Sequence, residues 1–171
     1  KLSFSYKSIA IKKNKQGVKP KVAILREQGI NGHKEMAYAF MMSGFEAQDI
    51  HVNDILDNNI DVNKFEGLVA CGGFSYGDVL GAGKGWASKI LYNDKLKDKL
   101  DLFFNNQSKF ALGVCNGCQM LSQLKTIIPG SSRWPSFASN MSNQFEARLS
   151  RVRINKSKSI FLRDMEKSIL P

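Results

Sequence analysis

Two short apolar segments, each running directly into glycine-containing turns, do most to constrain the fold of this chain. Gly67–Cys71 (GLVAC) is followed by a pair of glycines, and Phe110–Val114 (FALGV) is followed by the sequence Cys-Asn-Gly. A strand that is apolar along its whole length has both faces covered, as in parallel sheets with helices on either side. The two segments therefore predict an open, mostly parallel α/β sheet with helices on both faces.

The other segments predict strands that alternate with helices. Further strands are expected at Lys21–Arg26 and Glu46–Val52, helices at Asn31–Ser43, Trp86–Leu91, Asp94–Phe104 and Gly117–Leu124, and an added strand at Phe145–Ile154. Alternation at this spacing indicates βαβ units in one sheet.

Loops at one edge of this sheet are expected to form a single site. Ligands bind such sheets beyond the carboxyl ends of the strands. The loops 28–33, 72–78 and 115–119 all fall there. The helix of residues 31–43 is expected to pack on the core through one face, which carries Met36, Ala37, Phe40 and Met41.

Composition favours one soluble domain in a reducing compartment. The 171 residues are 43% hydrophobic, enough for a substantial core. The net charge is +10, but basic residues are spread along the chain, so no nucleic-acid partner is expected. No segment approaches the roughly 20 apolar residues of a membrane span, and residues 1–17 lack the apolar centre of a signal peptide. Three cysteines without a disulfide framework favour the cytoplasm.

Cys115 stands at a predicted strand-to-helix turn, between Gly113 and Gly117. Glycines on both sides are typical of the tight turn that displays the nucleophile of many hydrolases. Such a turn places the sulfur beside backbone N–H groups at the positive end of a helix, where a thiolate is favoured over a thiol. We therefore expect Cys115 to be a nucleophile, and the glycines of the 72–78 loop to present N–H groups to a developing oxyanion.

The residues alone leave other interpretations of this region. Cys115 also fits a buried structural cysteine, and with Cys118 it forms a C-x-x-C pair of the kind found in redox and zinc sites. A redox pair normally stands earlier in the βαβ order, and zinc needs a second pair of ligands, so both are disfavoured. The glycines of 81–85 suggest a phosphate loop, but Asp78 and Gly85 stand where that pattern needs Gly and Ser or Thr, which excludes it.

A general base is harder to predict. A cysteine nucleophile normally needs an imidazole to take its proton, and the chain has two histidines. His33 opens a predicted helix and borders the expected site. His51 ends a polar strand and is expected at the surface. Neither is a convincing base.

The motifs, taken in order, resemble one enzyme family. The chain is similar to the class I (triad) glutamine amidotransferases, which have a flavodoxin-like sheet, and among them to the glutaminase domains of large-form phosphoribosylformylglycinamidine synthases. The similarity runs from Lys19 to about Arg148, through Val22–Gly29, Asn31 with Glu35-Met36, Ala70–Gly83, Gly85–Ala87, Leu112–Met120, Ile128–Gly130, Trp134-Pro135 and Phe145–Arg148.

This resemblance implies a role for each motif residue. Cys115 would attack the side-chain amide of glutamine and release ammonia. Gly73 and Asn116 would supply the N–H groups of an oxyanion hole, and Gln119 would help to seat the substrate. The segment itself would need no cofactor. A synthetase domain preceding Lys1 would use ATP and Mg²⁺ to convert formylglycinamide ribonucleotide to its amidine with this ammonia, in de novo purine biosynthesis.

The same resemblance predicts how the chain is organised. Residues 1–19 would be a linker from the synthetase domain, and residues 20–171 the N-terminal part of a glutaminase domain. The triad histidine and glutamate would lie beyond Pro171, so the isolated chain is expected to be inactive. Lys84 departs from the family, which usually has glutamate there. Two other hypotheses are a non-catalytic structural or docking domain of the same fold, and a different cysteine hydrolase.

Overall fold

The computed structural model describes residues 1–3 and 17–171, and the chain divides into two compact units. Residues 13–138 form the larger unit, and residues 1–12 with 139–171 form the smaller one. The predicted linker at residues 1–19 falls mainly on residues 4–16, which lie outside the described residues. The division into linker and glutaminase domain stays a prediction.

A four-stranded parallel sheet forms the centre of the larger unit, in the order β2-β1-β3-β4. Its strands are β1 (Lys21–Arg26), β2 (Glu46–His51), β3 (Gly67–Ala70) and β4 (Phe110–Gly113). β1 and β3 each pair with a strand on both sides, and the side chains from Val22 to Leu25 are fully buried. The predicted α/β fold class is confirmed, and all four strands end at the same edge of the sheet.

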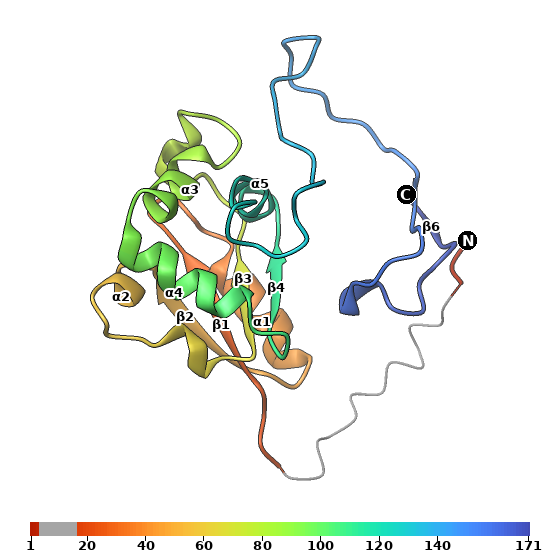
Figure 1. The fold of residues 1–171 in the computed structure, drawn as a ribbon. Coiled ribbons are helices and arrows are strands. Elements are labelled where there is room, and N and C mark those ends of the chain that lie inside the picture. Colours follow the sequence, from red (N-terminus) through yellow and green to blue (C-terminus); the bar gives the residue numbers. More distant parts are fainter. Residues whose placement is uncertain (4–16) are drawn as a thin grey trace. The chain divides into compact units, whose positions relative to one another are not determined.

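Helices cover both faces of this sheet (Figure 1). α1 (His33–Met42) packs against β1 and β2 on one face. On the other face α2 (Val52–Leu56), α3 (Lys84–Leu91) and α4 (Asp94–Phe104) pack against one another, and α5 (Asn116–Gln123) lies beside α3 against β3 and β4. Two short 3₁₀ segments, η2 (Val62–Lys64) and η3 (Ser75–Asp78), lie in the connections on either side of β3.

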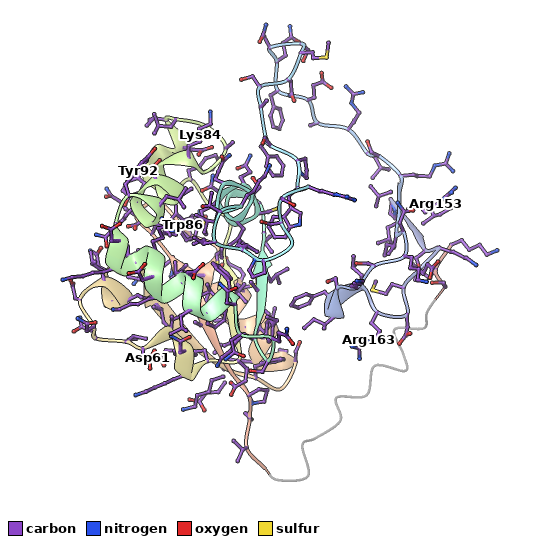
Figure 2. The ribbon with its side chains drawn as sticks, viewed as in Figure 1. Asp61, Lys84, Trp86, Tyr92, Arg153 and Arg163 are labelled. Atoms are coloured by element: carbon purple, nitrogen blue, oxygen red, sulfur yellow. The ribbon has the colours of Figure 1, made fainter. Side chains whose placement is uncertain are left out.

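Each long helix follows from local sequence signals. The Asn93 side chain accepts a hydrogen bond from the Leu96 N–H at 3.1 Å and so caps α4. Leu96, Leu100 and Phe103 recur at helical spacing and are buried. In α3, Trp86 is fully buried whereas Lys84 lies at the exposed start of the helix (Figure 2).

Three details of the larger unit differ from the sequence-based expectations. Met41 is 57% exposed because the buried stripe of α1 is narrow and ends at Phe40. β4 is only half-buried, not covered like β3, because it pairs with β3 alone in the described part of the chain. α2 was not predicted, and it begins at Val52, where a longer β2 was expected.

The smaller unit holds a correction at residues 145–154. The long strand predicted there is wrong: only β5 (Val152–Arg153) is extended, and it pairs antiparallel with β6 (Ile169–Leu170). A short 3₁₀ segment, η4 (Ile160–Leu162), lies between them. Phe145 and Leu149 are almost fully exposed, so their alternation with polar residues has no apolar surface to pack on within this unit. None of the helices in the described ranges is long and apolar enough to cross a membrane.

Candidate active site

Cys115 lies in a sharp turn between β4 and α5. Its backbone has φ 54° and ψ −118°, a conformation that residues with a side chain rarely adopt. The Val114 N–H donates to the Ala70 carbonyl at 3.0 Å, which holds the end of β4 against β3. Immediately afterwards the Gly117 N–H donates to the Val114 carbonyl at 3.0 Å and reverses the chain. The predicted strand-to-helix turn is therefore present, with Cys115 at its apex and exposed.

Close contact between α5 and β3 explains one glycine of this turn. A Cβ atom on Gly117 would lie 2.1 Å from the Ala70 carbonyl oxygen, well inside contact distance. Any larger residue would push the first turn of α5 away from the sheet. The first turn therefore stays directly behind Cys115, where the unpaired N–H groups of a helix N-terminus favour negative charge.

The three cysteines occupy different surroundings. Cys71 is fully buried at the end of β3, and burial, with smaller contributions from the charges of Asp49 and Glu35, raises the pKa of its thiol to about 12. It is therefore protonated and inert near neutral pH. Cys115 and Cys118 are both free and exposed. Cys115 alone combines exposure with the strained apex of the turn.

Asn116 connects this turn to the loop that follows β3. Its side chain is buried, and Oδ1 accepts hydrogen bonds from the Ser75 hydroxyl at 2.6 Å and the Ser75 N–H at 3.3 Å. Its Nδ2 group donates to Gln119 Oε1 at 3.2 Å. The 72–78 loop, Asn116 and Gln119 thus form one hydrogen-bonded unit next to Cys115, as the shared location of the loops predicted. Ser75 was not predicted to contribute.

Gly73 lies in a loop that is packed against the end of β1. Its φ is +143°, and a Cβ atom there would lie 2.7 Å from the Ile30 Cα and 2.8 Å from the Asn31 nitrogen. On either side, the Gly32 N–H donates to the Gly72 carbonyl at 3.0 Å and the Phe74 N–H donates to the Gly29 carbonyl at 2.9 Å.

The loop that carries Gly73 approaches the Cys115 thiol at Gly72, and Asn116 directly follows Cys115. A Cβ atom on Gly72, which precedes Gly73, would lie 3.8 Å from the Cys115 sulfur. Within the described residues, neither the Gly73 N–H nor the Asn116 N–H donates to another protein group. Both N–H groups are thus free of protein acceptors in the described part of the chain.

Neither histidine contacts Cys115 through a hydrogen bond among the described residues. His51 is used elsewhere: its Nδ1 accepts from the Asn53 N–H at 3.1 Å, and its Nε2 lies 3.1 Å from Glu27 Oε1. His33 opens α1, and its buried Nδ1 has no hydrogen-bond partner in the described part of the chain. The structure thus gives Cys115 no imidazole partner from these two residues.

A buried charged group lies under the same loops and was not predicted. Glu27 follows β1 directly and is only 3% exposed. His51, Tyr76 and Lys89 surround its carboxylate, and we call these four residues the Glu27 cluster. The one sequence signal was a charged residue at the buried end of an apolar strand. The partners themselves come from three other elements.

Comparison with known proteins places this geometry in a family. Residues 19–171 match the family described as the CobB/CobQ-like glutamine amidotransferase domain. Among solved structures, the chain is similar to PurLQS from Thermotoga maritima, with 28% sequence identity over 63% of this chain and a TM-score of 0.49. The match covers 45% of that solved chain, so this chain spans less than half of its length. Since the family match extends over nearly all of the sequence, the chain belongs to the CobB/CobQ-like glutamine amidotransferase family.

Proposed function

We propose that this chain carries the glutaminase site of a phosphoribosylformylglycinamidine synthase, with Cys115 as its nucleophile. One observation carries the proposal: Cys115 is exposed at the strained apex of the β4–α5 turn, next to the loop that carries Gly73. The family match supports glutamine as the substrate. The ordered motifs from Val22 to Arg148 support this particular synthase.

The first chemical step follows from the position of the sulfur. The Cys115 thiolate attacks the side-chain carbonyl carbon of glutamine, and the π electrons of that carbonyl move to its oxygen. The Gly73 and Asn116 N–H groups donate hydrogen bonds to this oxyanion, which stabilises the tetrahedral intermediate. When the intermediate collapses, the C–N bond breaks, and the amine takes a proton and leaves as ammonia. A γ-glutamyl thioester remains on Cys115.

Water completes the reaction. It attacks the thioester carbonyl, the C–S bond breaks, and glutamate leaves while the thiolate is restored. Both steps need a group that removes and returns protons. His51 is held by Glu27 and Asn53, and the buried Nδ1 of His33 has no hydrogen-bond partner among the described residues. We therefore propose that an imidazole from outside these 171 residues performs this role.

Gln119 is proposed to seat the substrate. Its side-chain oxygen is already occupied by the Asn116 Nδ2 group, at 3.2 Å. This contact directs the side chain of Gln119 toward the turn and leaves its amide N–H groups for a ligand. The α-carboxylate of glutamine has acceptor oxygens that such a donor can recognise.

The ammonia is proposed to pass to a synthetase domain. That domain would use ATP and Mg²⁺ to convert formylglycinamide ribonucleotide to its amidine, a step of purine biosynthesis in the cytoplasm. Glutamine and this synthetase domain are the partners proposed for the chain. The residues described here supply only the nucleophile, the oxyanion donors and part of the substrate seat.

The proposal is tested by paired substitutions in the full-length enzyme. Cys115→Ala should abolish the glutamine-dependent reaction, by roughly 10³-fold or more, while synthesis from added ammonium salts continues. Cys118→Ala, which changes an exposed cysteine of α5 one turn away, should retain both reactions. Ammonia release by the Cys115→Ala enzyme at the wild-type rate would disprove the proposed nucleophile.

A further inference from the structure

We propose that Glu27 is a positioning residue for the glutaminase site, holding the 72–76 loop so that the Gly73 N–H faces the oxyanion. This inference rests on the proposed function, because it concerns the same site. The evidence is the arrangement of the Glu27 cluster between the end of β1, the 72–76 loop and α3. None of its members touches Cys115 through a contact described above.

Both oxygens of the Glu27 carboxylate are engaged. Oε1 accepts a hydrogen bond from the Gln28 N–H at 2.9 Å and lies 3.1 Å from His51 Nε2. His51 Nδ1 accepts from the Asn53 N–H, so both ring nitrogens of His51 lie against polar partners. Oε2 lies 2.8 Å from Lys89 Nζ. The angles are not those of a hydrogen bond, so this contact is an ion pair.

The charges of the cluster balance without any group from solvent. Glu27 and Lys89 form an ion pair of opposite charges. Burial acts to lower the pKa of Lys89, but the interactions with Glu27 and Tyr76 together outweigh it and raise that pKa above its ordinary value. A buried ion pair of this kind resists separation, because removal of either partner would leave an uncompensated charge.

Tyr76 connects the cluster to the loop. Its phenol interacts with Glu27 and with Lys89, and burial followed by the Glu27 charge raises the pKa of the phenol, so the hydroxyl stays a donor. The Oε2 atom of Glu27 is buried and lacks a directed hydrogen bond, so it is the acceptor available to that hydroxyl. The backbone of Tyr76 is left-handed, at φ 53° and ψ 36°, which a residue with a side chain adopts only when its surroundings hold it.

Glu27 also acts on the loop through the backbone. The Gln28 peptide donates its N–H to Glu27, and the Gln28 carbonyl accepts from the Tyr76 N–H at 2.9 Å. The side chain of Tyr76 thus interacts with Glu27, and its backbone is held by Gln28, which itself donates to the same carboxylate. Gly73 lies three residues earlier, between two further backbone hydrogen bonds to the 28–32 segment. A displacement of about 1 Å at such a donor is enough to lower a rate by roughly 10²-fold.

The test compares two reagents on Cys115 in the full-length chain. A diazoketone analogue of glutamine reacts through a tetrahedral intermediate and needs the oxyanion donors, whereas iodoacetamide alkylates the sulfur without them. Glu27→Gln and Tyr76→Phe should each slow diazoketone labelling of Cys115 by roughly 10-fold to 100-fold. Alkylation by iodoacetamide should stay within about twofold of wild type.

Two matched control variants distinguish a displacement of the 72–76 loop from a general loss of stability. Glu46→Gln removes an acidic partner of a lysine at the opposite end of the strands, where Glu46 lies 3.7 Å from Lys21. Tyr92→Phe removes the hydroxyl of an exposed tyrosine at the end of α3. Both controls should label like wild type. If Glu27→Gln does not fold, Tyr76→Phe, which keeps the ring and the ion pair, carries the test.

The outcomes distinguish this inference from the proposed function. Equal rates of diazoketone labelling for wild type and Tyr76→Phe would overturn the positioning role of Glu27 and leave the proposed function standing. Equal slowing by both reagents would also overturn it, since Glu27 would then maintain access to Cys115 and not the oxyanion donor. No labelling of Cys115 in the wild type would overturn the proposed function and this inference with it.

Discussion

Cys115 lies in the β4–α5 turn and Gly73 in the loop that approaches it, and both residues have a positive φ angle. At Cys115 the strain is borne by a residue with a side chain, at φ 54°. At Gly73, φ +143° is open only to glycine, and a side chain would also strike the 30–31 backbone. Strain that persists in a folded protein is held by the structure around it. Here the surrounding structure holds the turn of Cys115 and the 72–78 loop in place.

Gly73→Ala is therefore predicted to damage the site more than the fold. The added methyl group has to push the loop away from Ile30, which moves the Gly73 N–H. We expect glutamine hydrolysis to fall by roughly 10²-fold in the full-length enzyme. Gly81→Ala is the control, because Gly81 also has a positive φ of 70° but nothing within 4 Å of its Cβ position. Steady-state kinetics with equal losses in both variants would contradict this account of Gly73.

The raised pKa of the Cys71 thiol predicts that the stability of the fold depends on pH. Its pKa is raised from the ordinary 9.0 to about 12, chiefly by burial. Between these values the unfolded chain loses the thiol proton and the folded chain keeps it, so the free energy of unfolding falls as pH rises. Urea unfolding at about pH 8 and about pH 10 should show a decline for wild type that Cys71→Ala reduces by about 1 kcal/mol. Parallel declines in the two proteins would show that Cys71 ionises normally.

At the scale of elements, the first residue of α3 has a positive charge, which the helix dipole disfavours at that end. Lys84 is the first residue of this helix and is exposed, where the helix dipole favours a negative side chain. The N-cap is Gly83, which provides no side-chain hydrogen bond. The resemblance described above has glutamate at this position. The departure thus bears on the stability of α3, which carries Lys89 of the Glu27 cluster.

Lys84→Glu should stabilise the chain by about 0.3–1 kcal/mol. In a thermal melt this corresponds to a rise of roughly 1–4 °C in Tm for a chain of this size. Lys84→Met, which removes the charge without reversing it, should give about half of that gain. The gain should shrink in high salt, because surface charges are screened. A Tm that falls in the glutamate variant would mean that Lys84 makes a favourable contact.

Elements with a strong local signal could be predicted from the sequence. β1 and α4 have the predicted bounds, since an apolar β-branched run and an amphipathic pattern with an asparagine cap specify them locally. Phe145–Ile154 alternates like a strand but has no sheet to join, and alternation alone does not stabilise a strand. α2 is only five residues long and depends on the capping box of His51 and Asp54, which is easily overlooked.

The candidate site could be predicted in part. Cys115, Gly73, Asn116 and Gln119 come from sequence motifs, and the structure brings them together around one turn. Their catalytic roles stay predictions. Glu27, Tyr76 and Lys89 could not be grouped beforehand, because their contact arises from β1, the 72–76 loop and α3 meeting in space. Nothing in the local sequence of any one of them indicates the other two.

For the whole molecule, we expect the nucleophile and the general base to come from different segments of the enzyme. Neither histidine is hydrogen-bonded to Cys115 among the described residues, so the 171-residue chain alone should release negligible ammonia from glutamine. Loss of the general base typically lowers the rate by 10²–10⁴-fold or more. An ammonia assay on this segment and on the full-length enzyme makes the comparison. Turnover by the segment near that of the intact enzyme would show that His33 serves as the base.

The most direct test of the central claim is to map the covalent adduct formed with the diazoketone analogue of glutamine. Peptide mass spectrometry of the labelled full-length enzyme locates the modified cysteine. The account predicts that Cys115 carries the adduct, that excess glutamine protects it, and that Cys71 and Cys118 remain unmodified. An adduct on Cys118, or labelling of Cys115 that glutamine does not slow, would contradict the claim that Cys115 is the nucleophile of a glutamine site.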